Sequence, residues 1–149
     1  MQTINQLCDV IRKTAYQIHL YHGHGHLEKV YENALAHRLK KLGLTVQQQH
    51  PLKVYDEDGT LIGEYYADLV VEGRLIVELK AVRAFADEHV AQILGYLKSS
   101  QTEHGLLINF GSQKFQIKKY ILNDAGPKRA VKNVTNLLWF ALVTAFFFR

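Results

Sequence analysis

The sequence contains little cysteine and no obvious export signal. Its one cysteine, Cys8, excludes an internal disulfide and every cysteine-rich zinc module, and it is typical of a reducing compartment. The N-terminal segment carries Asp9, Arg12 and Lys13 where a secretory signal peptide needs an apolar core. Internal repeats and low-complexity linkers are also absent. We therefore expect one cytoplasmic domain.

Charged residues are present but unevenly distributed. The composition, 48% hydrophobic and 21% charged, is that of a globular chain with a single core. Residues 1–110 hold 11 Lys and Arg against 13 Asp and Glu, whereas residues 111–149 hold 7 against 1. A basic segment beside an acidic centre is what a polyanion-binding enzyme needs. A solvated basic surface explains the charge equally well.

Apolar periodicity divides the chain into helices and strands. Helical spacing predicts three helices, over residues 3–23, 27–43 and 85–101, with Gly43 ending the second. Apolar and alternating runs predict extended segments over residues 44–56 (interrupted at Pro51), 61–71, 74–82, 105–111 and 114–122. A strand–helix–strand step over residues 75–110 favours a right-handed crossover between parallel strands. The order predicts a single-domain α/β (α+β) fold with a mixed sheet flanked by helices.

The run ADLVVEGRLIVELKAV, residues 67–82, places Asp68, Glu78 and Lys80 in an otherwise apolar hairpin. A three-residue loop with a left-handed glycine is a common hairpin type, and it would put Asp68 directly across from Glu78. A two-residue loop would send the two carboxylates to opposite faces. We predict the three-residue loop, which pairs Val71 with Leu75. By strand alternation, we expect Asp68 to share a face with Tyr66 and Val70.

In that register the two carboxylates lie roughly 4–6 Å apart and repel each other by about 3–4 kcal/mol at an effective dielectric near 20. Lys80, on the same face as Glu78, offsets part of this repulsion. A divalent cation offsets more, and all-oxygen ligands suit Mg²⁺ or Mn²⁺. The alternative is a structural ion pair of Lys80 with one acid. The hairpin alone leaves both interpretations open.

The pattern Asp68-x9-Glu78-x-Lys80 on a hairpin followed by a helix resembles the PD-(D/E)XK nuclease superfamily. Gly25, Glu28 and Tyr31 have the spacing that names the GxxExxY protein family. The segments ADLVV, IVELKAV, HVAQILGYLK and GLLINFG resemble that family's other blocks in order, over roughly residues 3 to 120. The resemblance implies an αβββαβ nuclease core. It departs from the superfamily's name at Ala67, where the name has a proline that carries no chemistry.

The same resemblance implies roles for the charged residues. Asp68, Glu78 and Glu28 would surround a Mg²⁺ or Mn²⁺ ion, and the Leu79 carbonyl would add a ligand. Lys80 would orient or polarise the attacking water.

The helix that follows the hairpin extends the resemblance. Its segment QILGY matches the Gln-x3-Tyr of RecB-like members, which implies that Gln92 and Tyr96 support Lys80 and the phosphate backbone. The implied function is a metal-dependent nuclease, with DNA favoured over RNA. The alternative is a non-catalytic module that binds nucleic acid or protein on a nuclease-like fold. The repulsive Asp68–Glu78 pair argues against that alternative.

The chain ends in a basic and then apolar extension. We place the nuclease-like domain at residues 1–125 and the extension at 126–149. Twelve helical residues, 137–148, would span about 18 Å, short of the roughly 30 Å hydrocarbon core. We therefore expect this tail to pack on the domain or form a homodimer contact, with a position at a membrane surface as the alternative, rather than to cross a membrane. The residues expected to contact backbone phosphates are Lys114, Lys118, Lys119, Lys128, Arg129 and Lys132.

Overall fold

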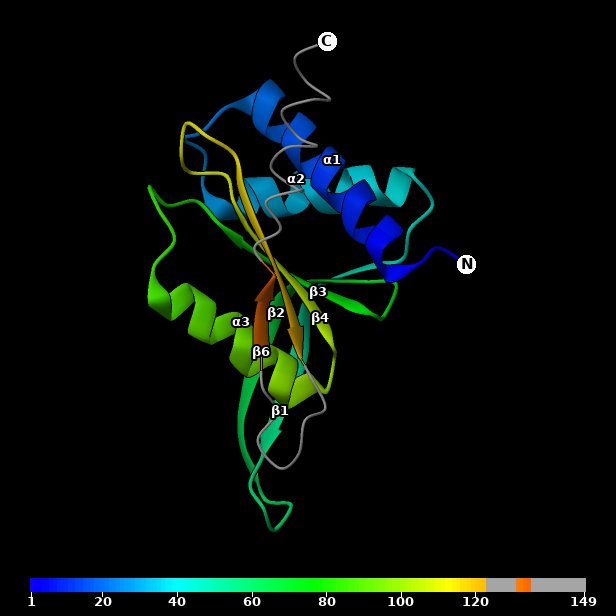
Figure 1. Cartoon of the computed structure of the whole chain (residues 1–149), viewed down its shortest axis with the longest axis vertical. Helices are drawn as coiled ribbons and strands as arrows, with labels where there is room; N and C mark the ends of the chain where they lie inside the picture. The colour runs from blue at the N-terminus through cyan, green and yellow to red at the C-terminus, as the bar shows by residue number, and fades with distance from the viewer. Residues whose placement is uncertain (123–130, 135–149) are drawn as a thin grey trace.

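Helices cover both faces of a mixed β-sheet in the computed structural model (Figure 1), which describes residues 1–122 and 131–134. Two of them, α1 (Ile4–His22) and α2 (Glu28–Lys41), lie on one face. The third, α3 (Asp87–Ser100), lies on the other. All three agree with the helices expected from apolar spacing. Gly43 follows the end of α2 with a φ of 84°, the left-handed conformation that favours glycine there.

The sheet of the described residues has six strands in the order of the chain. Neighbouring strands are antiparallel except β3 and β4, which are parallel and joined through α3. The predicted parallel step is therefore confirmed, and β6 is an addition that the sequence did not predict. The strands are β1 (Val46–Tyr55), β2 (Leu61–Val71), β3 (Leu75–Lys80), β4 (His104–Asn109), β5 (Gln116–Leu122) and β6 (Val131–Val134).

β1 runs through Pro51 without the predicted interruption, since Pro51 pairs with Tyr66 of β2. The reason is the position of β1 at one end of the strand order. An edge strand has one row of backbone groups without a strand partner, so a proline there need not remove a ladder hydrogen bond. The irregular backbone of β1 falls instead at Gln49, whose φ is 50°, and between Val54 and Tyr55, where the register with β2 shifts.

The sheet separates two apolar clusters. Alternation along β3 sends Leu75, Val77 and Leu79 toward α1 and α2, and Ile76 toward α3. Aromatic rings pack together beneath α1 and α2. The Tyr31 ring stacks on the Phe110 ring at a centroid distance of 4.7 Å. Burial of such side chains on both faces supplies most of the stabilising free energy of a domain. Side chains of β3 are therefore buried on both faces of the sheet up to Leu79, directly before Lys80.

The hairpin of β1 and β2 extends beyond the body of the molecule (Figure 1). Much of its surface is apolar and exposed, including Tyr55, Ile62, Tyr65 and Tyr66. Within the described ranges, no helix combines the length and apolar character needed to cross a membrane. Apart from β6, the predicted C-terminal extension and its apolar tail lie outside the described residues.

Candidate functional site

The predicted hairpin register is confirmed. Val71 pairs with Leu75, and the pairing continues to Leu69 and Val77, which places Asp68 opposite Glu78. The connecting loop contains Glu72 and Gly73, with φ values of 54° and 63°. Both residues are left-handed, and only the glycine adopts that conformation without steric cost. The loop thus fixes a register that brings two carboxylates together.

Each carboxylate is held by the backbone of the opposite strand. The Asp68 N–H donates to Glu78 Oε1 at 2.9 Å, and the Leu79 N–H donates to Asp68 Oδ2 at 2.8 Å. The paired residues of β2 and β3 end at Leu69 and Val77, and beyond that point these side-chain hydrogen bonds connect the two strands. The two carboxylates are therefore oriented by fixed donors, and the Leu79 backbone lies against one of them.

Side-chain alternation along β2 changes phase at Asp68. Leu69 packs beneath α1 and α2, whereas Ala67 packs in the cluster beneath α3, although strict alternation would put both on one face. Tyr66 is exposed, while Val70 joins the cluster beneath α3. The prediction that these two residues share a face is wrong, because the strand twists out of phase at the site.

Gln49 of β1 lies opposite Asp68, where the alternation of β2 changes phase, and its side chain extends into the site. Its amide donates to Asp68 Oδ1 at 3.3 Å and also to Glu32. Glu32 lies on α2, is only 2% exposed and accepts from Lys29 Nζ at 2.7 Å. We did not predict a role for Gln49 or Glu32 from the sequence. A signal for Glu32 was present, because it lies four residues after Glu28 and so shares its helix face.

Burial and like charge act together on the carboxyl groups. Burial, reinforced by the charge of Asp68, raises the pKa of Glu78 to about 9. Burial also raises the pKa of Asp68. The pKa of Glu28 rises for the same reason, with a further contribution from Asp68, while Lys80 acts in the opposite direction. The predicted residues Glu28, Asp68, Glu78 and Lys80 therefore lie within electrostatic range of one another, and the site has an excess of acid.

Lys80 is held by α3 rather than by an acid. Its Nζ donates to Gln92 Oε1 at 2.7 Å, and Gln92 Nε2 donates to the Tyr96 hydroxyl at 2.9 Å. None of the ion pairs between described residues includes Lys80. This arrangement disfavours the alternative in which Lys80 and one acid form a structural ion pair. The chain Lys80–Gln92–Tyr96 instead presents an ammonium group beside the two carboxylates.

A family model for the PD-(D/E)XK nuclease superfamily matches residues 5–120. This chain belongs to the PD-(D/E)XK nuclease superfamily. Its α2, the three strands β1–β3, α3 and β4 form the αβββαβ core expected from the resemblance.

Comparison with solved structures supports the superfamily fold. A crystal structure of SSO0001 superimposes with a TM-score of 0.52 at 16% sequence identity, over 61% of this chain and 48% of that one. The match thus spans about half of SSO0001, and at this identity it supports the fold alone. A search of curated proteins finds no match to this chain.

The donors of this superfamily member suit a hard divalent cation. Asp68 and Glu78 supply carboxylate oxygens, and the backbone of Leu79 lies beside them, since its N–H donates to Asp68 Oδ2. In residues 1–122 and 131–134, no three Asp, Glu, His or Cys side chains are grouped to hold a metal. A cation here would take two carboxylates and complete its shell with backbone, water or phosphate oxygens, as Mg²⁺ commonly does.

The predicted phosphate-binding lysines separate onto two sides of β5. Lys118 lies in register with Leu107 and Glu78 across β5, β4 and β3. Neighbouring strands are about 4.8 Å apart, so the Lys118 Cα lies roughly 10 Å from that of Glu78 on the same face. Its Nζ sits 5.3 Å from the ring centroid of Phe85. Lys114 is exposed in the loop before β5.

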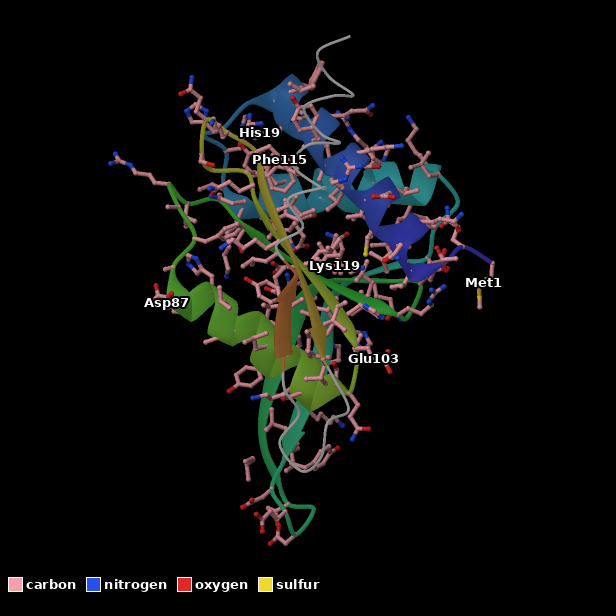
Figure 2. The ribbon with its side chains drawn as sticks, viewed as in Figure 1. Met1, His19, Asp87, Glu103, Phe115 and Lys119 are labelled. Atoms are coloured by element: carbon pink, nitrogen blue, oxygen red, sulfur yellow. The ribbon has the colours of Figure 1, made fainter. Side chains whose placement is uncertain are left out.

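Lys119 points to the opposite face. It is 9% exposed, and its Nζ donates to Asn5 Oδ1 at 2.8 Å, beneath α1 (Figure 2). A lysine buried and bonded in this way does not offer its charge to a polyanion, so we leave it out of the phosphate surface. Lys128 and Arg129 lie outside the described residues.

A buried asparagine that we did not predict fixes the end of β3. Asn109 is fully buried and pairs with Lys80 across β3 and β4. Its Oδ1 accepts from the N–H groups of Val82 and Gly111, at 3.0 and 2.9 Å, and its Nδ2 donates to the Val82 carbonyl at 2.8 Å. The Phe110 N–H donates to the Lys80 carbonyl at 2.8 Å. These bonds hold the chain on the C-terminal side of Lys80.

Proposed function

We propose that this protein is a metal-dependent nuclease that hydrolyses phosphodiester bonds in nucleic acid, with Mg²⁺ or Mn²⁺ as its cofactor. The observation that carries the proposal is the Asp68–Glu78 pair. Two largely buried carboxylates face each other, and Lys80 is directed to Gln92 instead of neutralising either acid. Such a pair opposes folding unless something positive compensates for it, and a divalent cation does so best.

Asp68 and Glu78 would hold the cation and the Leu79 carbonyl would add a ligand, while Glu28 lies near enough to add its negative charge to the site. When bound, the cation supplies an activated water and offsets charge on the phosphate. The ammonium of Lys80, positioned by Gln92 and Tyr96, would orient the attacking water. These roles follow the contacts of the residues, because hydrogen bonds hold both carboxylates of the pair and the Lys80 ammonium before any substrate arrives.

We further propose that the chain belongs to the GxxExxY family within the superfamily. Gly25 has a φ of 118°, a backbone conformation open to glycine and strained for other residues. The Tyr31 hydroxyl donates to the Gly23 carbonyl at 2.7 Å and accepts from the His26 N–H at 3.2 Å. The motif's glycine and tyrosine thereby shape the loop before α2, and Glu28 is the first residue of that helix.

Exposed and half-buried lysines support nucleic acid as the substrate. Lys118 lies on the face of Glu78 and Lys114 lies exposed in the adjoining loop. Phosphate contacts position a strand without reading its bases, so they give no sequence preference. We propose DNA rather than RNA from superfamily membership.

The experiment is a cleavage assay on single-stranded DNA, double-stranded DNA and RNA with Mn²⁺, Mg²⁺ or EDTA. Wild type is compared with Asp68→Asn and with the matched control Asp58→Asn, which lies in the exposed turn between β1 and β2. We expect Asp68→Asn to abolish cleavage while retaining nucleic-acid binding, and Asp58→Asn to cleave like wild type. Cleavage by Asp68→Asn at the wild-type rate would contradict the proposal. Binding by wild type without cleavage under every metal condition would favour a non-catalytic module.

A further inference from the structure

A shallow pocket of about 280 Å³ lies directly beside the Lys80–Gln92–Tyr96 chain. One wall is Tyr65 of β2, and the rest comes from a single face of α3. Because residues three and four apart on a helix are neighbours, the α3 residues form a continuous surface. They are Glu88, Ala91, Gln92, Gly95 and Tyr96. Two of the residues that hold or support Lys80 therefore also line this pocket.

Tyr65 provides the pocket with a fixed aromatic surface. Its ring packs against Tyr96, with centroids 5.5 Å apart and planes at 41°, yet the residue remains 50% exposed. An exposed tyrosine held by a second aromatic ring is a rigid surface for stacking another planar group. Proteins that bind single strands use such side chains, and each stacked base contributes about 1–3 kcal/mol.

Gly95 leaves the floor of the pocket open. It lies inside α3, where glycine costs about 1 kcal/mol of helix stability relative to alanine. A Cβ at this position would meet nothing within 4 Å, so packing among the described residues does not require glycine. Gly95 is half-buried, and the small side chain of Ala91, which is exposed, adds to the opening. These two small residues give a flat group access to the ring of Tyr65.

The pocket's charges favour a base over a phosphate. Among the residues that the structure describes, its lining includes the carboxyl group of Glu88 and the amide of Gln92 but no lysine, arginine or histidine. A carboxylate repels phosphate, whereas it accepts hydrogen bonds from the exocyclic amino group of a base such as cytosine. An aromatic wall with a polar rim matches a nucleobase, which has apolar faces and a polar edge.

We propose that this pocket receives an unstacked nucleobase beside the scissile phosphate, so that the substrate is single-stranded or has unpaired nucleotides at the cleavage point. The bases of a duplex are stacked and paired, and one enters such a pocket only after it is extruded, which costs a few kcal/mol. The identity of the scissile phosphate rests on the proposed nuclease function. The binding preference of the pocket does not.

The test separates binding from cleavage. Anisotropy titrations in EDTA compare a fluorescent single-stranded oligodeoxycytidylate, whose bases carry an exocyclic amino group, with a duplex of equal length, using wild type, Tyr65→Ala and Tyr65→Trp. Tyr66→Ala is the matched control, because Tyr66 is 52% exposed next to Tyr65 in β2. We expect Tyr65→Ala to weaken single-strand binding about tenfold and Tyr65→Trp to retain it, as loss and replacement of one stacking surface require. Tyr66→Ala should change it less than about twofold.

A second variant shows whether lost binding reflects lost folding. Gly95→Leu fills the pocket while placing a better helix former in α3. We expect weaker single-strand binding together with an equal or higher melting temperature. A 2-aminopurine base in the oligonucleotide should lose fluorescence on binding wild type and retain it with Tyr65→Ala.

Several outcomes would contradict the proposal that this pocket binds an unstacked nucleobase. Equal effects of Tyr65→Ala and Tyr66→Ala, or equal loss of single-strand and duplex binding, would do so. So would unchanged binding by Gly95→Leu. If wild type cleaves DNA but Tyr65→Ala alters neither single-strand binding nor the cleavage rate, the nucleobase-binding proposal is wrong and the nuclease proposal is retained. If single-strand binding depends on Tyr65 but no metal condition gives cleavage, the nuclease proposal is wrong and the nucleobase-binding proposal is retained.

Discussion

Replacing Glu78 by glutamine should make the metal-free protein more stable at neutral and alkaline pH. Glu78 is 2% exposed, and burial together with the charge of Asp68 raises its pKa from 4.5 to about 9. The side chain therefore carries a proton in the folded metal-free protein at pH 7. In the unfolded chain it is ionised at that pH.

The direction of the pH effect follows from proton binding. Between pH 4.5 and about 9, the folded state holds a proton on Glu78 that the unfolded state has lost, so the free energy of unfolding falls as pH rises. From pH 5 to pH 8 this decrease is about 4 kcal/mol if the full shift applies. The amide in the Glu78→Gln variant does not titrate, so the variant's advantage over wild type should grow by about that amount.

Urea unfolding followed by circular dichroism in EDTA at pH 5 and pH 8 measures this difference. Glu57→Gln, in the exposed turn between β1 and β2, is the matched control and should follow wild type at both pH values. Saturating Mn²⁺ should stabilise wild type at pH 8 and leave Glu78→Gln unchanged. If wild type and Glu78→Gln keep a constant stability difference from pH 5 to pH 8, Glu78 is ionised in the folded state and the reasoning is refuted.

Four further substitutions test Lys80 and the segments around the site. Asn109→Ala should lower the free energy of unfolding by about 2–4 kcal/mol, because it removes a fully buried side chain and the bonds that it makes to the half-buried N–H and carbonyl of Val82; a change below about 1 kcal/mol in urea unfolding would contradict this. Gly111→Ala should destabilise by about 3 kcal/mol or more, since its Cβ would lie 2.2 Å from the Val82 nitrogen. Gly95→Ala, with no such contact, should stabilise by about 0.5–1 kcal/mol, and thermal melts showing the same sign for both would be inconsistent with the structure. Lys80→Met should abolish cleavage while retaining Mn²⁺ binding, and a wild-type cleavage rate would remove Lys80 from the mechanism.

The central hairpin could be predicted because several local signals agree. Charges in an apolar run, a glycine in the loop and the two-residue period of strands together select the register that places Asp68 opposite Glu78. The placement of Gln92 and Tyr96 on one face of the helix after the hairpin could also be predicted, since the two residues lie four apart in the sequence.

Other features depend on contacts between distant segments. The left-handed φ of Gln49 and the phase change at Asp68 arise where β1, β2 and α2 meet, and single-strand alternation does not predict either. Lys118 and Lys119 are consecutive, so one must face each side of β5. Which one faces the site depends on its pairing with Leu107 of β4. Asn109 sits within an apolar strand, where its several backbone bonds leave no periodic signal.

The most direct test of the account is Mn²⁺ binding measured by titration calorimetry without nucleic acid. Wild type is compared with Asp68→Ala and Glu78→Ala, in buffers of different ionisation enthalpy. We predict one saturable site that both substitutions abolish. Binding near pH 7 should release about one proton, because the ion requires Glu78 in its ionised form. Saturable binding that survives both substitutions would place the metal elsewhere and contradict the central claim.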